Sequence, residues 1–167
     1  MSDNNIYEER LFSNKTEVFI IGLTLLFLIL FIWRLGTDRP GFLSTVFLFL
    51  TFFFFFYSVN YRILIIHLDS ESLKLKFGIF TWMIELDNID ECRQDDLPIL
   101  MKYGGAGIHF MLIQGRYRAS FNFLEHPRVV ISLKKRAGPV RDISFSTSHP
   151  DEVIRLIRAA TSTWSAT

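Results

Sequence analysis

The side chains that most often carry chemistry occur in this chain at spacings that do not assemble a reactive site. Its four histidines are isolated, and none forms the close pairs by which a strand or a helix presents metal ligands: His67, His109, His126 and His149. The fold would have to build any metal site in three dimensions. We therefore keep a small membrane-bound metal-dependent hydrolase, built on His67, His109 and nearby acids, as an alternative to the leading hypothesis.

Other catalytic patterns are also weak. The serines lack the sequence context of a nucleophile elbow. The stretch Gly104-Gly105-Ala106-Gly107 lacks the Gly-Lys-Ser/Thr sequence of a phosphate-binding loop, so we interpret it as a loop between strands. The single cysteine, Cys92, lies among acidic residues that disfavour a thiolate. We expect no enzymatic activity, no metal and no cofactor.

Charge distribution gives the clearest functional signal. Residues 62–101 hold four basic and eight acidic side chains, whereas residues 102–149 hold eight basic and two acidic ones. Near an anionic membrane each basic residue contributes about 1 kcal/mol of attraction. The net charge of +1 argues against nucleic acid as a partner. Six basic residues become candidate contacts for anionic lipid headgroups or a membrane protein partner: Arg116, Arg118, Arg128, Lys134, Lys135 and Arg136. Faces of opposite charge could also pair between copies as a homo-oligomer.

Two uncharged windows, residues 18–33 and 41–59, indicate where the chain enters a lipid bilayer. Each holds thirteen Leu, Ile, Phe or Val residues, which together favour membrane insertion by roughly 4–8 kcal/mol. We predict a transmembrane hairpin over 17–59, with helices at about 17–36 and 40–59. A cleaved signal peptide is the competing interpretation, but an acid-rich segment precedes the first window and no small-residue cleavage site follows it.

The flanking charges predict the orientation of this hairpin. Five basic residues flank its outer ends, whereas the connection between the helices holds two arginines. Because basic residues are retained on the cytoplasmic side, we expect both termini and the following domain to be cytoplasmic. The protein would then be a multi-pass protein of the cell (inner or plasma) membrane, in which residues 1–16 form an N-terminal cytoplasmic segment.

Residues 60–163 show the patterns of one β-rich domain that ends in a helix. A helix over about 149–162 follows from Ser148 as N-cap and from apolar residues at helical spacing. The acidic stretch Asp87–Asp96 begins a segment, 87–101, that we expect to be irregular, with room for one short helical turn, and its role stays open. Period-two alternation and turn residues predict seven strands, at 63–68, 73–77, 80–86, 108–113, 116–122, 128–133 and 140–146.

This arrangement resembles the bacterial two-helix membrane proteins that carry a bacterial PH-like (pleckstrin-homology-like) domain. The resemblance rests on the hairpin, on Leu75–Phe80 with Ile84 and Ile89, and on Ile143–Thr147 followed by Pro150–Ile154. It implies an α+β membrane protein in which a transmembrane hairpin leads into a PH-like β-sandwich or barrel of about seven strands, capped by a C-terminal helix. It implies no reaction.

The leading hypothesis is therefore a membrane-anchored, non-enzymatic module that interacts with proteins or lipids at the cytoplasmic membrane surface. An accessory subunit of a larger membrane complex is a further alternative, since such a subunit would have the same anchor and the same charged domain.

Overall fold

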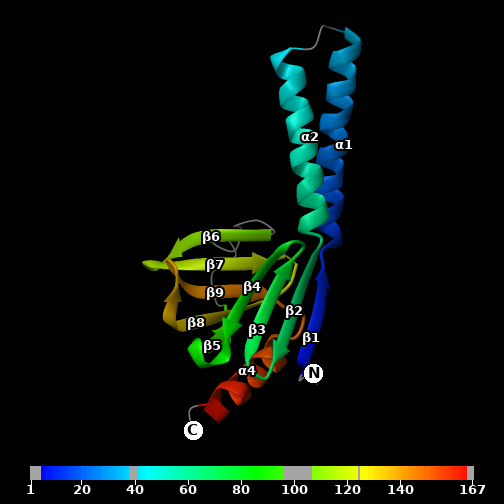
Figure 1. Cartoon of the computed structure of the whole chain (residues 1–167). Helices are drawn as coiled ribbons and strands as arrows, with labels where there is room; N and C mark the ends of the chain where they lie inside the picture. Colours follow the sequence, from blue (N-terminus) through cyan, green and yellow to red (C-terminus); the bar gives the residue numbers. More distant parts are fainter. Residues whose placement is uncertain (1–4, 38–40, 96–106, 124, 165–167) are drawn as a thin grey trace.

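The computed structural model describes residues 5–37, 41–95, 107–123 and 125–164. Two long helices, α1 (Asn14–Thr37) and α2 (Phe42–Asn60), form an antiparallel hairpin that projects from a β-domain (Figure 1). Both helices are long and apolar enough to cross a membrane. They contact each other through Phe27, whose ring stacks on that of Phe54 at 5.5 Å, while most other large side chains of the hairpin are exposed. Exposed apolar surfaces of this kind mark sites of contact with a membrane or with another protein.

The first sheet has four antiparallel strands in the order β1 (Asn5–Phe12), β2 (Ile63–Asp69), β3 (Ser72–Phe77) and β4 (Phe80–Glu85). We expected residues 1–16 to be an N-terminal cytoplasmic segment outside the β-domain, which we predicted over 60–163; residues 5–12 instead pair with β2 in that domain. Leu11 is the buried residue of β1, at 2% exposure, and it joins the core of the β-domain. The domain therefore includes chain from both sides of the hairpin.

The second sheet has five strands in the order β5-β8-β9-β7-β6, and its β7–β9 pair is parallel. Their bounds are β5 (Ile89–Gln94), β6 (Gly107–Ile113), β7 (Arg116–Asn122), β8 (Arg128–Ala137) and β9 (Val140–Ser146). The expectation of an irregular segment over 87–101 is wrong for Ile89–Gln94, which form β5. The short helical turn expected in this segment corresponds to a 3-10 helix (η1, Leu86–Asn88) that leads into β5. Ile89 and Cys92 turn inward there while acidic neighbours stay exposed. Residues 96–101 lie outside the described residues, as does most of the glycine-rich stretch.

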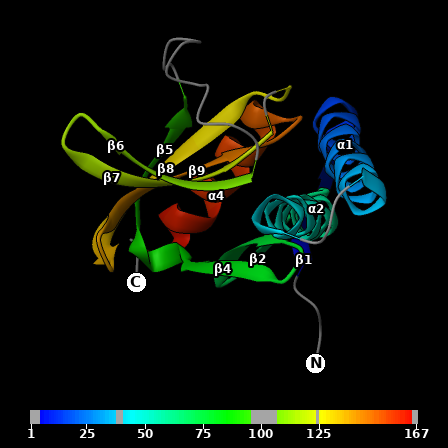
Figure 2. The same ribbon diagram turned by 90° about the horizontal axis from the view of Figure 1, so that it is seen from above.

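The core lies between the two sheets. The ring of Phe77 on β3 stacks with that of Phe121 on β7 and meets that of Phe123 edge-on, at centroid distances of 6.4 and 5.2 Å. Figure 2 shows the sheets as two layers with α4 (Pro150–Trp164) between them. Helix α4 buries Val153 and Ile157 and closes the end of the sandwich away from the hairpin (Figure 1). The result is a mixed α+β architecture in which the seven predicted strands are present, together with β1 and β5.

Candidate functional site

The hairpin joins the β-domain almost without connecting residues. One residue, Ser13, separates β1 from α1, and its side-chain oxygen accepts a hydrogen bond from the backbone N–H of Thr16 at 3.3 Å, as an N-cap does. Two residues separate α2 from β2. Phe12 and Ile63 are paired residues of β1 and β2. The two helices therefore continue as two neighbouring, hydrogen-bonded strands.

Side chains reinforce this junction on both sides. Glu17 on α1 and Arg62 after α2 form an ion pair at 3.0 Å. The ring of Tyr61 stacks on that of Tyr57 at 4.3 Å and lies 5.9 Å from that of Phe80 at the start of β4. These contacts hold the base of the hairpin against the first sheet.

The turn between β3 and β4 packs directly on the end of α2. Gly78 at this turn has a φ of +53°, and a Cβ atom there would lie 2.6 Å from the backbone oxygen of Asn60. The backbone N–H of Ile79 donates a hydrogen bond to Asn60 Oδ1 at 3.4 Å. Only glycine combines this left-handed backbone with so close an approach. The orientation of the hairpin is therefore fixed by main-chain contact as well as by chain connectivity.

Two of the six predicted basic contacts are buried. Arg118 and Arg128 are 3% and 7% exposed. Both reach Asp95, with Arg118 Nη1 at 3.2 Å from Oδ1 and Arg128 Nε at 3.3 Å from Oδ2, while Arg118 Nη2 lies 3.9 Å from Asp142. Burial lowers the pKa of Arg128, and the charge of Asp95 opposes that shift. We correct the expectation accordingly: these two arginines hold the fold together and are not exposed to a headgroup or a partner.

This ion-pair network belongs to a polar layer that sequence reasoning missed. Along β7, β8 and β9 most even-numbered residues, with the exception of Val140, lie outside the apolar core, and many are polar yet buried. Within the layer, Ser120 and Ser144 share a hydrogen bond of 2.6 Å, and Ser132 donates one to Asp142 at 3.0 Å. The available signal was period-two alternation of polar and apolar residues in three strands. The layer comprises Arg118, Ser120, Asn122, Arg128, Ser132, Asp142, Ser144 and Ser146.

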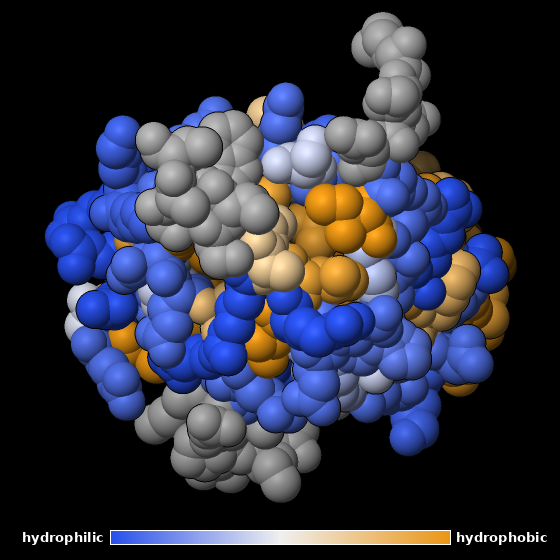
Figure 3. Space-filling model, turned by 90° about the horizontal axis from the view of Figure 1, so that it is seen from below, coloured by the Kyte–Doolittle hydropathy of each residue, from blue (hydrophilic) through white to orange (hydrophobic). Residues whose placement is uncertain are grey.

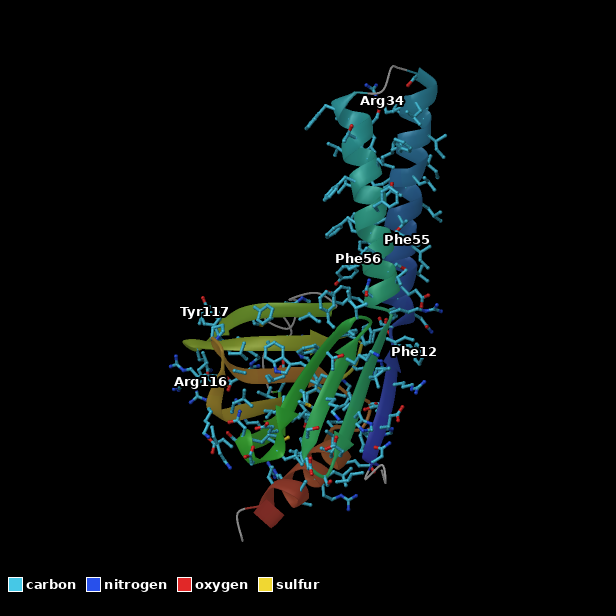
Figure 4. The ribbon with its side chains drawn as sticks, in the orientation of Figure 1. Phe12, Arg34, Phe55, Phe56, Arg116 and Tyr117 are labelled. Carbon is cyan, nitrogen blue, oxygen red and sulfur yellow. The ribbon has the colours of Figure 1, made fainter. Side chains whose placement is uncertain are left out.

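The other four predicted contacts lie together at one end of the second sheet, which we call the basic end: Arg116, Lys134, Lys135 and Arg136. The side chain of Arg116 is 52% exposed, and Figure 4 shows it at the end of the domain away from the hairpin. Lys134 Nζ donates a hydrogen bond to the backbone oxygen of Asp87 at 2.8 Å, so η1 fixes its position. Arg136 is exposed. The fold thus brings these four residues together but directs them away from the hairpin.

Among the described residues, no group of three His, Cys, Asp or Glu side chains is placed to hold a metal ion. His67 lies on β2 and His109 on β6, which belong to different sheets. The ring of His126 instead contacts the backbone oxygen of Phe12 at 3.2 Å. Burial raises the pKa of the Cys92 thiol to about 12, against the smaller opposing effect of Arg158, which leaves the thiol protonated at neutral pH.

Comparison of the chain with protein-family models, with curated proteins and with solved structures finds no match in any of the three.

Proposed function

We propose that this chain is a membrane-anchored, non-enzymatic interaction module that holds a PH-like β-domain at the cytoplasmic surface of the cell membrane in one fixed orientation. The observation that carries the proposal is the pairing of Phe12 with Ile63, which joins both ends of an apolar hairpin to adjacent strands of one sheet. An anchor that served only to retain the domain could use a flexible linker. A rigid junction instead sets which surfaces face lipid and which face a partner.

The PH-like assignment draws on two packed sheets closed by a C-terminal helix. The resemblance implies about seven strands, and the domain has two more, β1 and β5. In addition, its β7 and β9 strands pair in parallel. We therefore use 'PH-like' as a proposed class for the domain, and the functional proposal is based on the rigid junction between the hairpin and the domain.

The basic end is the surface that we assign to a protein partner. It lies away from the hairpin, so a partner can approach it without displacing lipid (Figure 4). Its four cations favour an acidic partner surface, and such charges chiefly set the rate and specificity of association. A second copy of the chain is one such partner, since β5 exposes Asp90 and Glu91.

Labelling from the two sides of a membrane tests the anchor. In a chain with Cys92→Ser, we would introduce either Leu35→Cys, at the far end of α1, or Arg116→Cys, at the basic end. A membrane-impermeant maleimide added to intact cells should react with the first cysteine, and should react with the second only after permeabilisation. Equal labelling of both positions from one side would contradict a hairpin that spans the membrane.

The basic end is tested by charge reversal. A chain with Lys134→Glu, Lys135→Glu and Arg136→Glu should lose partners that are recovered with the unmodified chain in mild detergent. The matched control is Lys76→Glu on β3, which also reverses a charge on an exposed strand position. If the triple variant and the control recover the same partners, the basic end is not the contact surface.

A further inference from the structure

Two end strands, β4 of the first sheet and β6 of the second, carry few charged residues. Five apolar side chains on or next to these strands are partly or largely exposed: Phe80, Trp82, Phe110, Leu112 and Tyr117. We call this set the apolar rim. Phe110 and Leu112 are 59% and 62% exposed. The ring of Trp82 lies 6.3 Å from that of Phe110 and 6.1 Å from that of Phe121 in the core, so the rim is continuous with the core.

The end strands β4 and β6 differ in charge from the other two end strands, β1 and β5. The other two end strands carry several charges, with Glu8, Glu9 and Arg10 on β1 and a similar set on β5. Charged residues on an edge strand keep it from pairing or aggregating with other surfaces. By contrast, β6 (Gly107–Ile113) has no charged residue, and β4 has one, Glu85, at its last position. An edge without such protection is expected to be covered in the working protein.

The rim starts at the base of the hairpin. Phe80 contacts Tyr61 at the end of α2, and a Cβ atom on Gly107, the first residue of β6, would lie 2.5 Å from Tyr57 Oη. From there β6 runs outward as the strand of the second sheet nearest the hairpin, roughly across the hairpin axis (Figure 1). The opposite face of the molecule is mostly hydrophilic in its described part (Figure 3). Among the described strands of the second sheet, the one nearest the hairpin thus carries no charged residue.

We infer that the apolar rim rests in the interfacial layer of the same bilayer that holds the hairpin, and that these contacts dock the β-domain on the membrane. The inference rests on the proposed function, because it needs a hairpin that crosses the membrane. Continuity with the hairpin selects lipid as the occupant: a hairpin inserted to its base brings β6 to the level of the headgroups. Aromatic side chains such as Trp82 and Tyr117 are favoured at that level. The domain thus binds lipid through apolar contacts, whereas its basic end stays free for a partner.

Fluorescence of single tryptophans in vesicles tests this docking. The full chain would be reconstituted with lipids brominated in the upper acyl chain, which quench nearby indole rings. In one variant Trp33, Trp82 and Trp164 are replaced by Phe and Leu112→Trp is added. One further variant keeps only Trp33, on the hairpin, and another carries only Arg155→Trp, at an exposed position of α4. We expect emission from the L112W variant to fall about as strongly as that from the Trp33 variant, while the Arg155→Trp variant is unaffected.

The three variants separate the possible failures. Quenching of Trp33 without quenching of the tryptophan in L112W would overturn the docking and leave the anchor intact. Absence of quenching in both would overturn the anchor itself. A second rim variant, Phe110→Trp in the same background, guards against a local effect of L112W and should be quenched as well. If emission from both rim variants instead changes with the ratio of protein to lipid, and bromine has no effect, the rim contacts another copy and the inference is wrong.

Discussion

The carboxylate of Glu9 accepts a hydrogen bond from the backbone N–H of Ser148 at 2.7 Å, so the first strand of the chain is fastened to the residues that begin its last helix. The hydroxyl groups of Thr147 and Tyr7 donate to the same carboxylate at 2.5 and 2.9 Å. Glu9 therefore binds together two segments that lie 139 residues apart in the sequence. We therefore expect this contact to make the stability of the β-domain depend on pH.

Glu9→Gln should remove part of that dependence. Burial raises the pKa of Glu9, but the hydrogen bonds from Thr147 and Ser148 outweigh it and hold the pKa below its usual value of 4.5. A carboxylate with a depressed pKa stabilises the folded state above its unfolded pKa, and this stabilisation is lost as the pH falls through the folded pKa. Thermal midpoints of the chain in detergent, measured from neutral to acidic pH, should fall less steeply in Glu9→Gln and start lower at neutral pH.

Glu8→Gln is the matched control for this measurement, because Glu8 pairs with Arg10 on the exposed side of the same strand at 3.0 Å. A pH profile of Glu8→Gln close to that of the unmodified chain is expected. If Glu9→Gln keeps the full acid dependence, the pH-dependent stability does not come from this contact.

Asp95→Asn should destabilise the domain strongly. It removes the shared partner of two buried arginines, Arg118 and Arg128, and leaves their charges without compensation at Asp95. Breaking a buried ion pair by removal of one partner costs about 3–5 kcal/mol. Denaturant unfolding in detergent measures the loss. Arg116→Met is the control: this side chain is 52% exposed and lies 3.7 Å from Asp142, so its replacement should cost less than about 1 kcal/mol.

Gly78→Ala should destabilise the protein more than Gly138→Ala. Both glycines have a left-handed backbone, with φ of +53° and +64°, so both substitutions carry a similar strain of about 1–2 kcal/mol. At Gly78 the new methyl group would also meet the backbone of Asn60, whereas nothing lies within 4 Å of a Cβ atom at Gly138. The difference between the two thermal midpoints measures the contact between the hairpin and the β3–β4 turn. Equal midpoints would show that the backbone of Asn60 moves to accommodate the methyl group without loss of stability.

Leu11→Ala tests whether β1 is an integral strand of the domain. Leu11 is 2% exposed, and truncation of a buried leucine to alanine typically costs about 2–5 kcal/mol. Ile6→Ala on the same strand removes a side chain that is 44% exposed, and it should change stability by about 0.5 kcal/mol or less. Unfolding curves that coincide for both variants would show that β1 can detach while the rest of the domain remains folded.

Strand positions were predictable where one face of the strand is buried. In β2 the buried residues Leu64, Ile66 and Leu68 alternate with less buried ones, and this period is visible in the sequence. In β1 the sole buried residue is Leu11, and the strand is an edge whose partner lies beyond the hairpin. In β5, Ile89 and Cys92 alone turn inward among acidic residues. A window of sequence carries too little signal to detect such strands.

The basic residues illustrate a second limit. The sequence shows where the charges lie but not which of them the fold neutralises. Arg118 is 23 residues from Asp95 in the chain, and β8 and β9 lie between β5 and β7 in the sheet, so neither sequence distance nor strand pairing predicts this contact. Only the three-dimensional fold places an acid beside each buried arginine. The exposed part of the basic patch, at Lys134 to Arg136, was predictable because it extends a strand into a turn.

The pairing of β1 with β2 also constrains how the protein is made. These strands lie on either side of the hairpin in the chain, so β2 gains its outer neighbour only when both helices have formed. For a hairpin that crosses a bilayer, an intermediate with one helix inserted would leave Phe12 and Ile63 on opposite sides of the membrane. If the hairpin crosses a bilayer, as proposed, a chain with an odd number of crossings cannot close its first sheet and leaves the edge of β2 unpaired.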